Sequence, residues 1–208
     1  MEHRRLGRTG LRVSSVGLGT MTWGRDTDEL EAKEQLDIFL DTGGTLVDTA
    51  ASYGEGVSEE VIGALLREHV DRQDLVLVSK AGVRTWRTGE RSSVADASRG
   101  SLLDTLDTSL ARLGTDHLDL LLVQVPDPST SLEETAHALS LAVSSGRTRY
   151  VGIANHPAWA SVRMHDLLSE CGRGPGLAAV EVEHSLLSRG IERELRPASQ
   201  ALGFGILG

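Results

Sequence analysis

The chain has 208 residues, of which 39% are apolar, and a formal net charge of −9 at neutral pH. This length suits one domain, and an acidic balance without a dense Lys/Arg cluster argues against nucleic acid as a partner. The single cysteine, Cys171, excludes an intramolecular disulfide, and no apolar run reaches the roughly 18 residues of a membrane span. The N-terminus also lacks the apolar core of a signal peptide, so the sequence predicts a cytoplasmic protein.

Secondary structure is predicted to begin with a small hairpin that turns at Arg8-Thr9-Gly10. Short apolar runs then alternate with amphipathic helical patterns. The expected strands cover residues 15–19, 45–48, 75–80, 118–123, 150–154, 178–182 and 203–207. Most of these runs are continuous rather than alternating, which is typical of parallel strands covered on both faces.

Helices are expected between these strands and after the sixth of them. They lie near 28–42, from Ser58 onward, and near 98–113, 131–145, 158–170 and 190–201. The first is predicted to start at Thr27, the second at Ser58, and the third to end at Gly114.

Repeated strand–helix units admit either an open doubly wound sheet or a closed (β/α)₈ barrel. The first strand leads into "GLGTMTWG", whose glycines do not fit the G-x-G-x-x-G spacing of open dinucleotide-binding sheets. Polar residues instead end or follow several different strands, namely Asp48, Lys80, Gln124, Asn155 and Glu181. Active sites of (β/α)₈ barrels are built at that end of the strands. We therefore predict a single domain over residues 1–208, a (β/α)₈ TIM barrel with an N-terminal hairpin, in which about seven strands and six helices are present.

Three residues form a chemically coherent set. Asp48 ends one apolar run, Tyr53 follows it, and Lys80, one of only two lysines, ends another run. A free tyrosine titrates near 10, and a neighbouring ammonium lowers that pKa by favouring the phenolate. A carboxylate would keep the lysine charged and oriented. The set predicts a general acid for carbonyl reduction. Taken singly, each residue could instead cap a turn, pack or face solvent.

Four segments carry a resemblance to a known family. They read "RRLGRTGLRVSSVGLGTMTWG", "LVDTAASYGEGVSEEVIGALL", "SLARLGTDHLDLLLVQVPDP" and "VEHSLLSRGIERELRPASQALGFGIL". In this order they resemble the aldo-keto reductase family, in the branch that includes bacterial reductases and potassium-channel beta subunits. The resemblance implies an NADP-dependent oxidoreductase on a (β/α)₈ barrel. It would reduce an aldehyde or ketone with hydride from NADPH.

The resemblance also implies roles for individual residues. Tyr53 would donate the proton, Asp48 would pair with Lys80, and Gln124 would occupy a fourth catalytic position. The residues beside the cofactor would be Thr20, Met21, Asp48, Asn155 and Glu181, and Trp23 and Trp86 would line an apolar substrate pocket. Packing within loops is the alternative for both tryptophans.

Three positions depart from the family pattern. Gln124 stands where the family has a histidine; an amide can donate a hydrogen bond but cannot titrate. Ala154 replaces a serine beside Asn155, and Glu181 replaces a glutamine whose amide would grip the nicotinamide. An ionised Glu181 would favour the oxidised cofactor. These departures favour an alternative function, a cofactor-binding regulatory or interaction module with weak or no catalysis.

The family's last strand, its last helices and the segments that grip the cofactor phosphates would follow Gly208. We therefore expect the sequence to be an incomplete record, a truncation, or a chain that other material completes. A lyase or isomerase on an unrelated barrel would need a metal or phosphate site, and the histidines suggest no ligand cluster. No metal is expected. The expected partner is a small carbonyl substrate. The sequence leaves the oligomeric state open.

Overall fold

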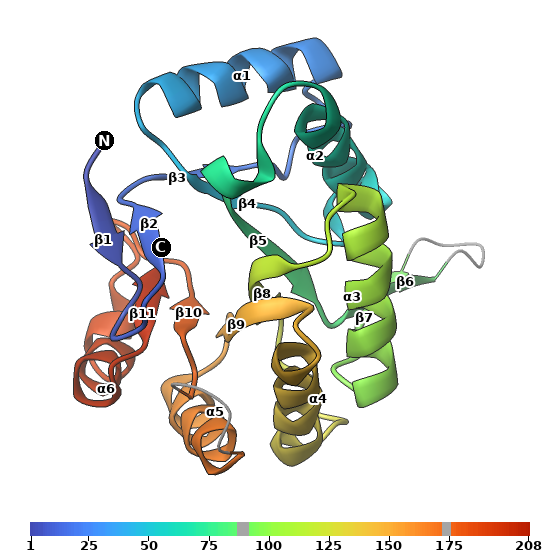
Figure 1. Cartoon of the computed structure of the whole chain (residues 1–208). Coiled ribbons are helices and arrows are strands. Elements are labelled where there is room, and N and C mark those ends of the chain that lie inside the picture. The colour runs from blue at the N-terminus through green and yellow to red at the C-terminus, as the bar shows by residue number, and fades with distance from the viewer. Residues whose placement is uncertain (87–91, 172–175) are drawn as a thin grey trace.

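The computed structural model describes residues 1–86, 92–171 and 176–208. Its centre is a parallel sheet of seven strands in the order β3-β4-β5-β8-β9-β10-β11. These strands are β3 (Gly17–Gly19), β4 (Leu46–Asp48), β5 (Val76–Ala81), β8 (Leu118–Val123), β9 (Thr148–Ala154), β10 (Ala179–Glu181) and β11 (Gly205–Leu207). Each strand pairs with the next one predicted along the chain, and the sheet curls (Figure 1). This arrangement confirms the predicted incomplete (β/α)₈ barrel.

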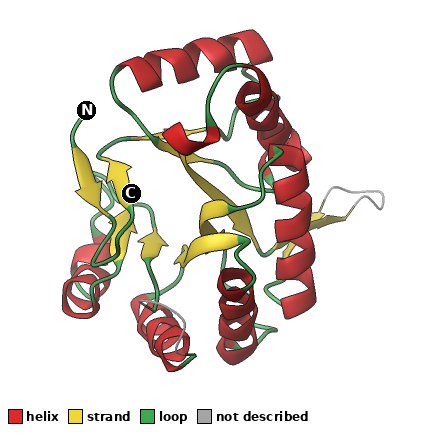
Figure 2. Cartoon of the chain, viewed as in Figure 1, coloured by secondary structure: helices red, strands yellow, loops and turns green. Residues whose placement is uncertain are grey.

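Helices cover the outer face of the curled sheet (Figure 2). They are α1 (Glu29–Asp41), α2 (Val57–Glu68), α3 (Arg99–Leu113), α4 (Leu132–Ser144), α5 (Ala158–Glu170) and α6 (Leu195–Leu202). The last is shorter than the predicted 190–201, because a 3₁₀ turn at Gly190–Glu192 precedes it. No helix within the described ranges is long and apolar enough to cross a membrane.

Two helix starts differ from the sequence prediction. The N-cap of α1 is Asp28 rather than Thr27, because the Asp28 carboxylate accepts hydrogen bonds from two amides of the first turn and Glu31 completes a capping box. Helix α2 begins at Val57, and Ser58 is buried inside its first turn. The Ser58 hydroxyl does not cap the helix; it donates to the backbone carbonyl of Thr20 at 2.9 Å.

The two faces of the strands belong to two separate apolar layers. Val47, Leu77 and Leu121 pack outward against the helices. Their neighbours Leu46, Val78, Leu120, Leu122 and Ala179 form an inner cluster with hairpin residues. Because strand side chains alternate, the next inward position of β4, β5 and β10 toward the carboxyl end is Asp48, Lys80 and Glu181 respectively. The apolar runs therefore end on charges where the interior of the barrel opens.

The predicted N-terminal hairpin is present, with β1 (His3–Arg5) antiparallel to β2 (Arg12–Ser14). It forms hydrogen bonds with segments near both ends of the curled sheet. The Ser14 hydroxyl accepts from the amides of Thr45 and Leu46 at the start of β4, and the Arg8 amide donates to the Gly203 carbonyl before β11. Gly7 is required there, because its φ is +59° and a Cβ would lie 2.3 Å from the Gly203 oxygen.

A second hairpin, β6 (Val83–Trp86) with β7 (Ser92–Ala95), was not predicted. It leaves the sheet directly after β5, through Gly82 at φ +94°. Trp86 was expected on a loop, but its backbone lies in β6, and its side chain lies outside the described residues.

Candidate active site

Lys80 is the centre of a cluster of polar side chains at the carboxyl ends of the strands. It is 2% exposed, and its Nζ donates to both carboxylate oxygens of Asp48 at 2.6 Å. The same nitrogen donates to the Tyr53 hydroxyl at 3.3 Å and lies 3.2 Å from Glu181 Oε1. Tyr53 begins the 3₁₀ turn Tyr53–Gly56 that follows β4. The structure thus places Lys80 in direct contact with both Asp48 and Tyr53 and adds Glu181, whose contact with Lys80 was not predicted.

The partners of Lys80 keep it charged. Burial alone would lower the pKa of its ammonium, but Asp48, Glu181 and Tyr53 outweigh burial, so the pKa is raised above the usual value. Lys80 is therefore a fixed cation beside the Tyr53 hydroxyl at neutral pH.

Tyr53 differs from the sequence prediction, which gave it a lowered pKa. Burial raises the pKa of the Tyr53 phenol, Lys80 opposes that rise, and Asp48 and Glu181 add to it; the net direction is upward. Burial of the phenol is the largest of these effects, and the two carboxyl groups that share the one ammonium offset part of its opposing effect. Tyr53 is consequently protonated at neutral pH and holds a proton that it can donate.

Asp48 and Glu181 both interact with the positive charge of the Lys80 ammonium. Burial raises the pKa of Asp48, while the Lys80 ammonium lowers it. Burial, together with the charge of Asp48, raises the pKa of Glu181 to about 7. Because Asp48 holds Lys80 through both oxygens, we assign the charged form to Asp48. Glu181 then takes up a proton near neutral pH, and its buried Oε2 has no hydrogen-bond partner among the described residues.

Gln124 and Asn155 follow β8 and β9 and contact one another. Asn155 Nδ2 donates to the backbone carbonyl of Gln124 at 3.0 Å, and Asn155 adopts φ +62°, which asparagine tolerates better than most residues. Gln124 Oε1 accepts from the Ser52 hydroxyl at 2.9 Å. Ser52 was not predicted as a site residue, since nothing in the sequence pairs it with a residue so distant along the chain.

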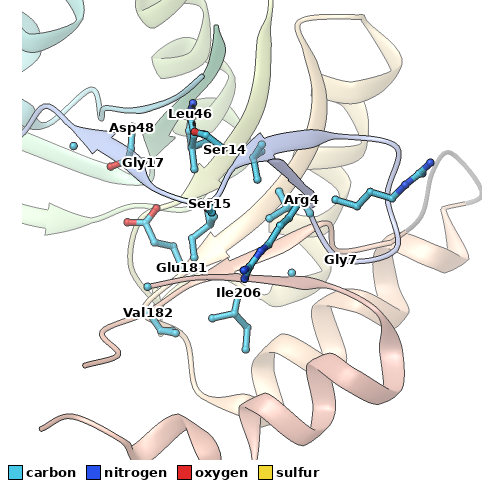
Figure 3. A pocket seen from close by; sticks show the side chains of 18 of the residues that line it. Arg4, Gly7, Ser14, Ser15, Gly17, Leu46, Asp48, Glu181, Val182 and Ile206 are labelled. Atoms are coloured by element: carbon cyan, nitrogen blue, oxygen red, sulfur yellow. Dashed lines mark hydrogen bonds between the residues drawn. The ribbon is translucent and has the colours of Figure 1, made fainter. Parts of the chain in front are cut away.

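Two cavities meet this cluster. A cavity of about 520 Å³ lies inside the curled sheet, and Asp48 and Glu181 line it (Figure 3), as does Asn155. A second pocket, of about 490 Å³, is lined by residues that include Met21, Tyr53 and Gln124. Asp48 faces the first cavity and Tyr53 the second, and Lys80 holds both, so the charged cluster stands between them.

Two of the residues expected to contact ligands have buried side chains that bond to other parts of the protein. The Thr20 hydroxyl is fully buried and donates to the Asp48 carbonyl at 2.9 Å, so it supports the end of β4. Trp23 is 0% exposed within the outer core, and its Nε1 donates to Gln35 Oε1 at 2.9 Å. The Trp23 side chain therefore packs rather than lining a substrate pocket. Met21 is 53% exposed at the second pocket.

Acidic, histidine and cysteine side chains are the groups that could bind a metal ion here. Across the ranges 1–86, 92–171 and 176–208, no group of three or more of them is placed to hold a metal ion.

Comparison with known proteins identifies the family. The model of the aldo/keto reductase family matches residues 15–208. The aldo-keto reductase YhdN of Bacillus subtilis is 36% identical over 160 residues, which cover 74% of this chain and 47% of that protein. The uncharacterized oxidoreductase YrpG of Bacillus subtilis is 34% identical over 221 residues, which cover 100% of this chain and 65% of that protein.

A solved structure gives the same result. The holo form of an aldo-keto reductase from Bacillus halodurans superposes with a TM-score of 0.83 at 29% identity, over 100% of this chain and 65% of that chain. The chain thus spans about half to two thirds of the length of these relatives. The match of the family model over residues 15–208 and the shared fold show that this chain belongs to the aldo/keto reductase family.

Proposed function

We propose that the protein reduces an aldehyde or ketone to an alcohol, with hydride from NADPH and with Tyr53 as the proton donor. The observation that carries this proposal is the contact of the Lys80 ammonium with the Tyr53 hydroxyl at 3.3 Å, beside a pocket that Tyr53 and Gln124 line. A phenol held against a buried cation is suited to release a proton to a developing alkoxide, because the cation stabilises the phenolate left behind.

The residues present fit the nicotinamide end of the cofactor. Its carboxamide needs a hydrogen-bond acceptor for the NH₂ group, and Glu181 Oε2 is a buried acceptor without a partner among the described residues. Asn155 uses its nitrogen on Gln124, which leaves its Oδ1 as a second acceptor. When bound, the nicotinamide supplies the hydride. The choice of NADPH over NADH rests on the family resemblance.

The side chains of this chain would divide the remaining work. Tyr53 donates its proton to the carbonyl oxygen, and Lys80 stabilises the phenolate that results. Asp48 keeps Lys80 charged and oriented through two 2.6 Å hydrogen bonds. Because Gln124 accepts from Ser52 through Oε1, its Nε2 group is available to donate to the substrate carbonyl.

The protonation of Glu181 limits the preference for the oxidised cofactor that the sequence predicts. Its pKa of about 7 means that the carboxylate charge is present chiefly above neutral pH. Any preference for the oxidised cofactor that arises from this charge would be confined to that range.

A cofactor-binding module with weak catalysis is the second candidate, because Gln124 cannot exchange protons as a histidine can. One assay separates the two functions. The full-length protein is mixed with NADPH and a panel of aldehydes, ketones and quinones, and both cofactor binding and NADPH oxidation are followed. Turnover supports the reductase, tight binding with negligible turnover supports the module, and absence of binding contradicts both.

Replacing Gln124 by His is expected to raise the rate of carbonyl reduction, by about ten-fold or more, because an imidazole can both donate a hydrogen bond and change its protonation state. The measurement is kcat with an aldehyde substrate. Gln73→His, on the 3₁₀ turn Arg72–Asp74 far from the site, is the matched control and should leave kcat unchanged. An unchanged kcat in Gln124→His would show that the amide at this position does not limit turnover.

A further inference from the structure

The proposed reaction uses Asp48, Lys80 and Tyr53 and leaves one partly buried carboxyl group without a part in the proton transfer. Glu181 lies at the inward end of β10, 27% exposed, with Oε1 3.2 Å from the Lys80 nitrogen. Asp48 reaches the same nitrogen from β4. One ammonium therefore has two carboxyl partners, supplied by strands at different positions in the sheet. Figure 3 shows the two carboxyl side chains, Asp48 and Glu181, at the same cavity.

The charge of this cluster depends on Glu181. With Asp48 and Glu181 both ionised, two negative charges surround one positive charge, and the Tyr53 hydroxyl sits beside a net negative group. With Glu181 protonated, the Asp48–Lys80 pair is neutral. A like charge near a phenol disfavours its phenolate, so ionised Glu181 opposes loss of the Tyr53 proton.

Other charged groups lie around the same cavity as Glu181. The cavity that Glu181 faces is also lined by Arg4 and Arg5 from β1 and by Glu183 after β10. Arg4 donates to Glu2 at 2.9 Å. Asp48 from β4 and Lys80 from β5 are the charged groups that interact with Glu181 most directly, and Asn155, which follows β9, is a neutral neighbour in the cavity lining.

We propose that Glu181 is a titrating positioning residue of the Lys80–Tyr53 pair: by sharing the Lys80 ammonium with Asp48, it makes Tyr53 a weaker acid when ionised and a stronger one when protonated. The effect acts through Lys80 and through the charge near the phenol. The link to carbonyl reduction rests on the function proposed above, whereas the effect on the Tyr53 proton does not.

The direction of the pH dependence follows from the protonation of Glu181. Burial and the charge of Asp48 raise the pKa of Glu181 to about 7. Below this pH Glu181 is neutral and Tyr53 is the better acid. As the pH rises through about 7, Glu181 ionises and carbonyl reduction should slow.

The first test measures the Tyr53 phenol directly, in cofactor-free protein. The chain has two tyrosines, so a Tyr150→Phe background leaves only the signal of Tyr53 in ultraviolet difference spectra. In Glu181→Gln the apparent pKa of Tyr53 should fall, which raises the phenolate fraction at a fixed alkaline pH. Glu183→Gln is the matched control, because Glu183 is exposed and lines the same cavity, and it should leave the titration unchanged. An unchanged titration in Glu181→Gln, or an equal change in Glu183→Gln, would overturn the proposal.

A second measurement needs no variant at position 181 and guards against misfolding of Glu181→Gln. In wild-type protein with ring-carbon-labelled tyrosine, the NMR signal of Tyr53 should shift with an inflection near the pH at which Glu181 titrates, about 7, and Tyr150 should show none. A Tyr53 signal without that inflection contradicts the proposal.

The pH dependence of the rate tests whether the response of Tyr53 to Glu181 also affects carbonyl reduction. The rate of carbonyl reduction in wild-type protein should fall as the pH rises through about 7, and the profile of Glu181→Gln should be flat in that range. If Tyr53 responds to Glu181 but no carbonyl is reduced, the proposed function fails while the coupling stands. If carbonyls are reduced but Tyr53 does not respond, the coupling fails alone.

Discussion

Replacement of Tyr53 by Phe is expected to lower the rate of NADPH-dependent carbonyl reduction by about 10²–10⁴-fold, because the variant loses the group that protonates the alkoxide. The hydroxyl is the one atom of Tyr53 that Lys80 contacts by a hydrogen bond, at 3.3 Å. The ring stays in place and the pocket keeps its shape. Cofactor binding should therefore be unchanged, and the loss should appear in kcat when turnover and NADPH affinity are measured together.

Tyr150→Phe is the matched control for this experiment, since it removes the only other phenolic hydroxyl of the chain. Tyr150 lies in β9 and packs against the inner apolar cluster. Its variant should retain wild-type turnover. If Tyr53→Phe keeps its kcat within a few-fold of wild type, another group supplies the proton and the assignment of Tyr53 is wrong.

Replacement of Lys80 by Met is expected to destabilise the protein by about 3–5 kcal/mol at pH 8, the cost of breaking a buried ion pair by removing one partner. Lys80 is 2% exposed, and its loss leaves Asp48 and Glu181 near each other without a cation. Turnover should also be lost, because no ammonium remains to stabilise the Tyr53 phenolate. Unfolding by denaturant measures the first effect and NADPH oxidation the second.

The destabilisation by Lys80→Met should depend on pH in a defined direction. Without the ammonium, the pKa values of Asp48 and Glu181 in the folded protein rise further above their unfolded values. A carboxyl group with a raised folded pKa favours folding below its unfolded pKa, and this contribution is lost as the pH rises through the folded pKa. The variant should accordingly be closer to wild type at pH 5 than at pH 8.

Two further variants make this experiment specific. Lys33→Met removes the other lysine, which is partly exposed and paired with Asp37 on α1, and should change stability by less than about 1 kcal/mol. The double variant Lys80→Met/Glu181→Gln removes one of the two opposed carboxylates and should recover part of the lost stability at pH 8. Equal losses at both pH values, with no recovery in the double variant, would show that packing rather than charge explains the cost.

The strands and the end of the barrel that holds the site were predictable because their sequence signals are local. The run "LDLLLV", which is apolar apart from Asp119, is typical of a strand buried on both faces of a covered parallel sheet, and it forms β8 over the predicted residues. Asp48 and Lys80 stand out because each puts a charge at the end of such a run. Gly114 ends α3 in a left-handed conformation, as predicted.

Features that depend on distant partners were missed or misassigned. Trp23 looked available for a substrate, but the core and Gln35 enclose it. The predicted fall in the pKa of Tyr53 considered Lys80 without the burial of the phenol, and burial, with smaller contributions from Asp48 and Glu181, reverses its direction. The hairpin β6–β7 has no strong alternation of polar and apolar residues, so it resembled a loop.

The sequence by itself determined the order of strands and helices, the family, and which residue types end the strands, because hydrophobic periodicity and end signals act over a few neighbouring residues. Only the tertiary structure decided that Asp48 and Glu181 share the Lys80 ammonium. The physical reason is that curling brings the inward positions of β4, β5 and β10 together at one buried point. The charge state of each of these groups then depends on the other two, and residues 48, 80 and 181 are too far apart in the sequence for any local pattern to encode that dependence.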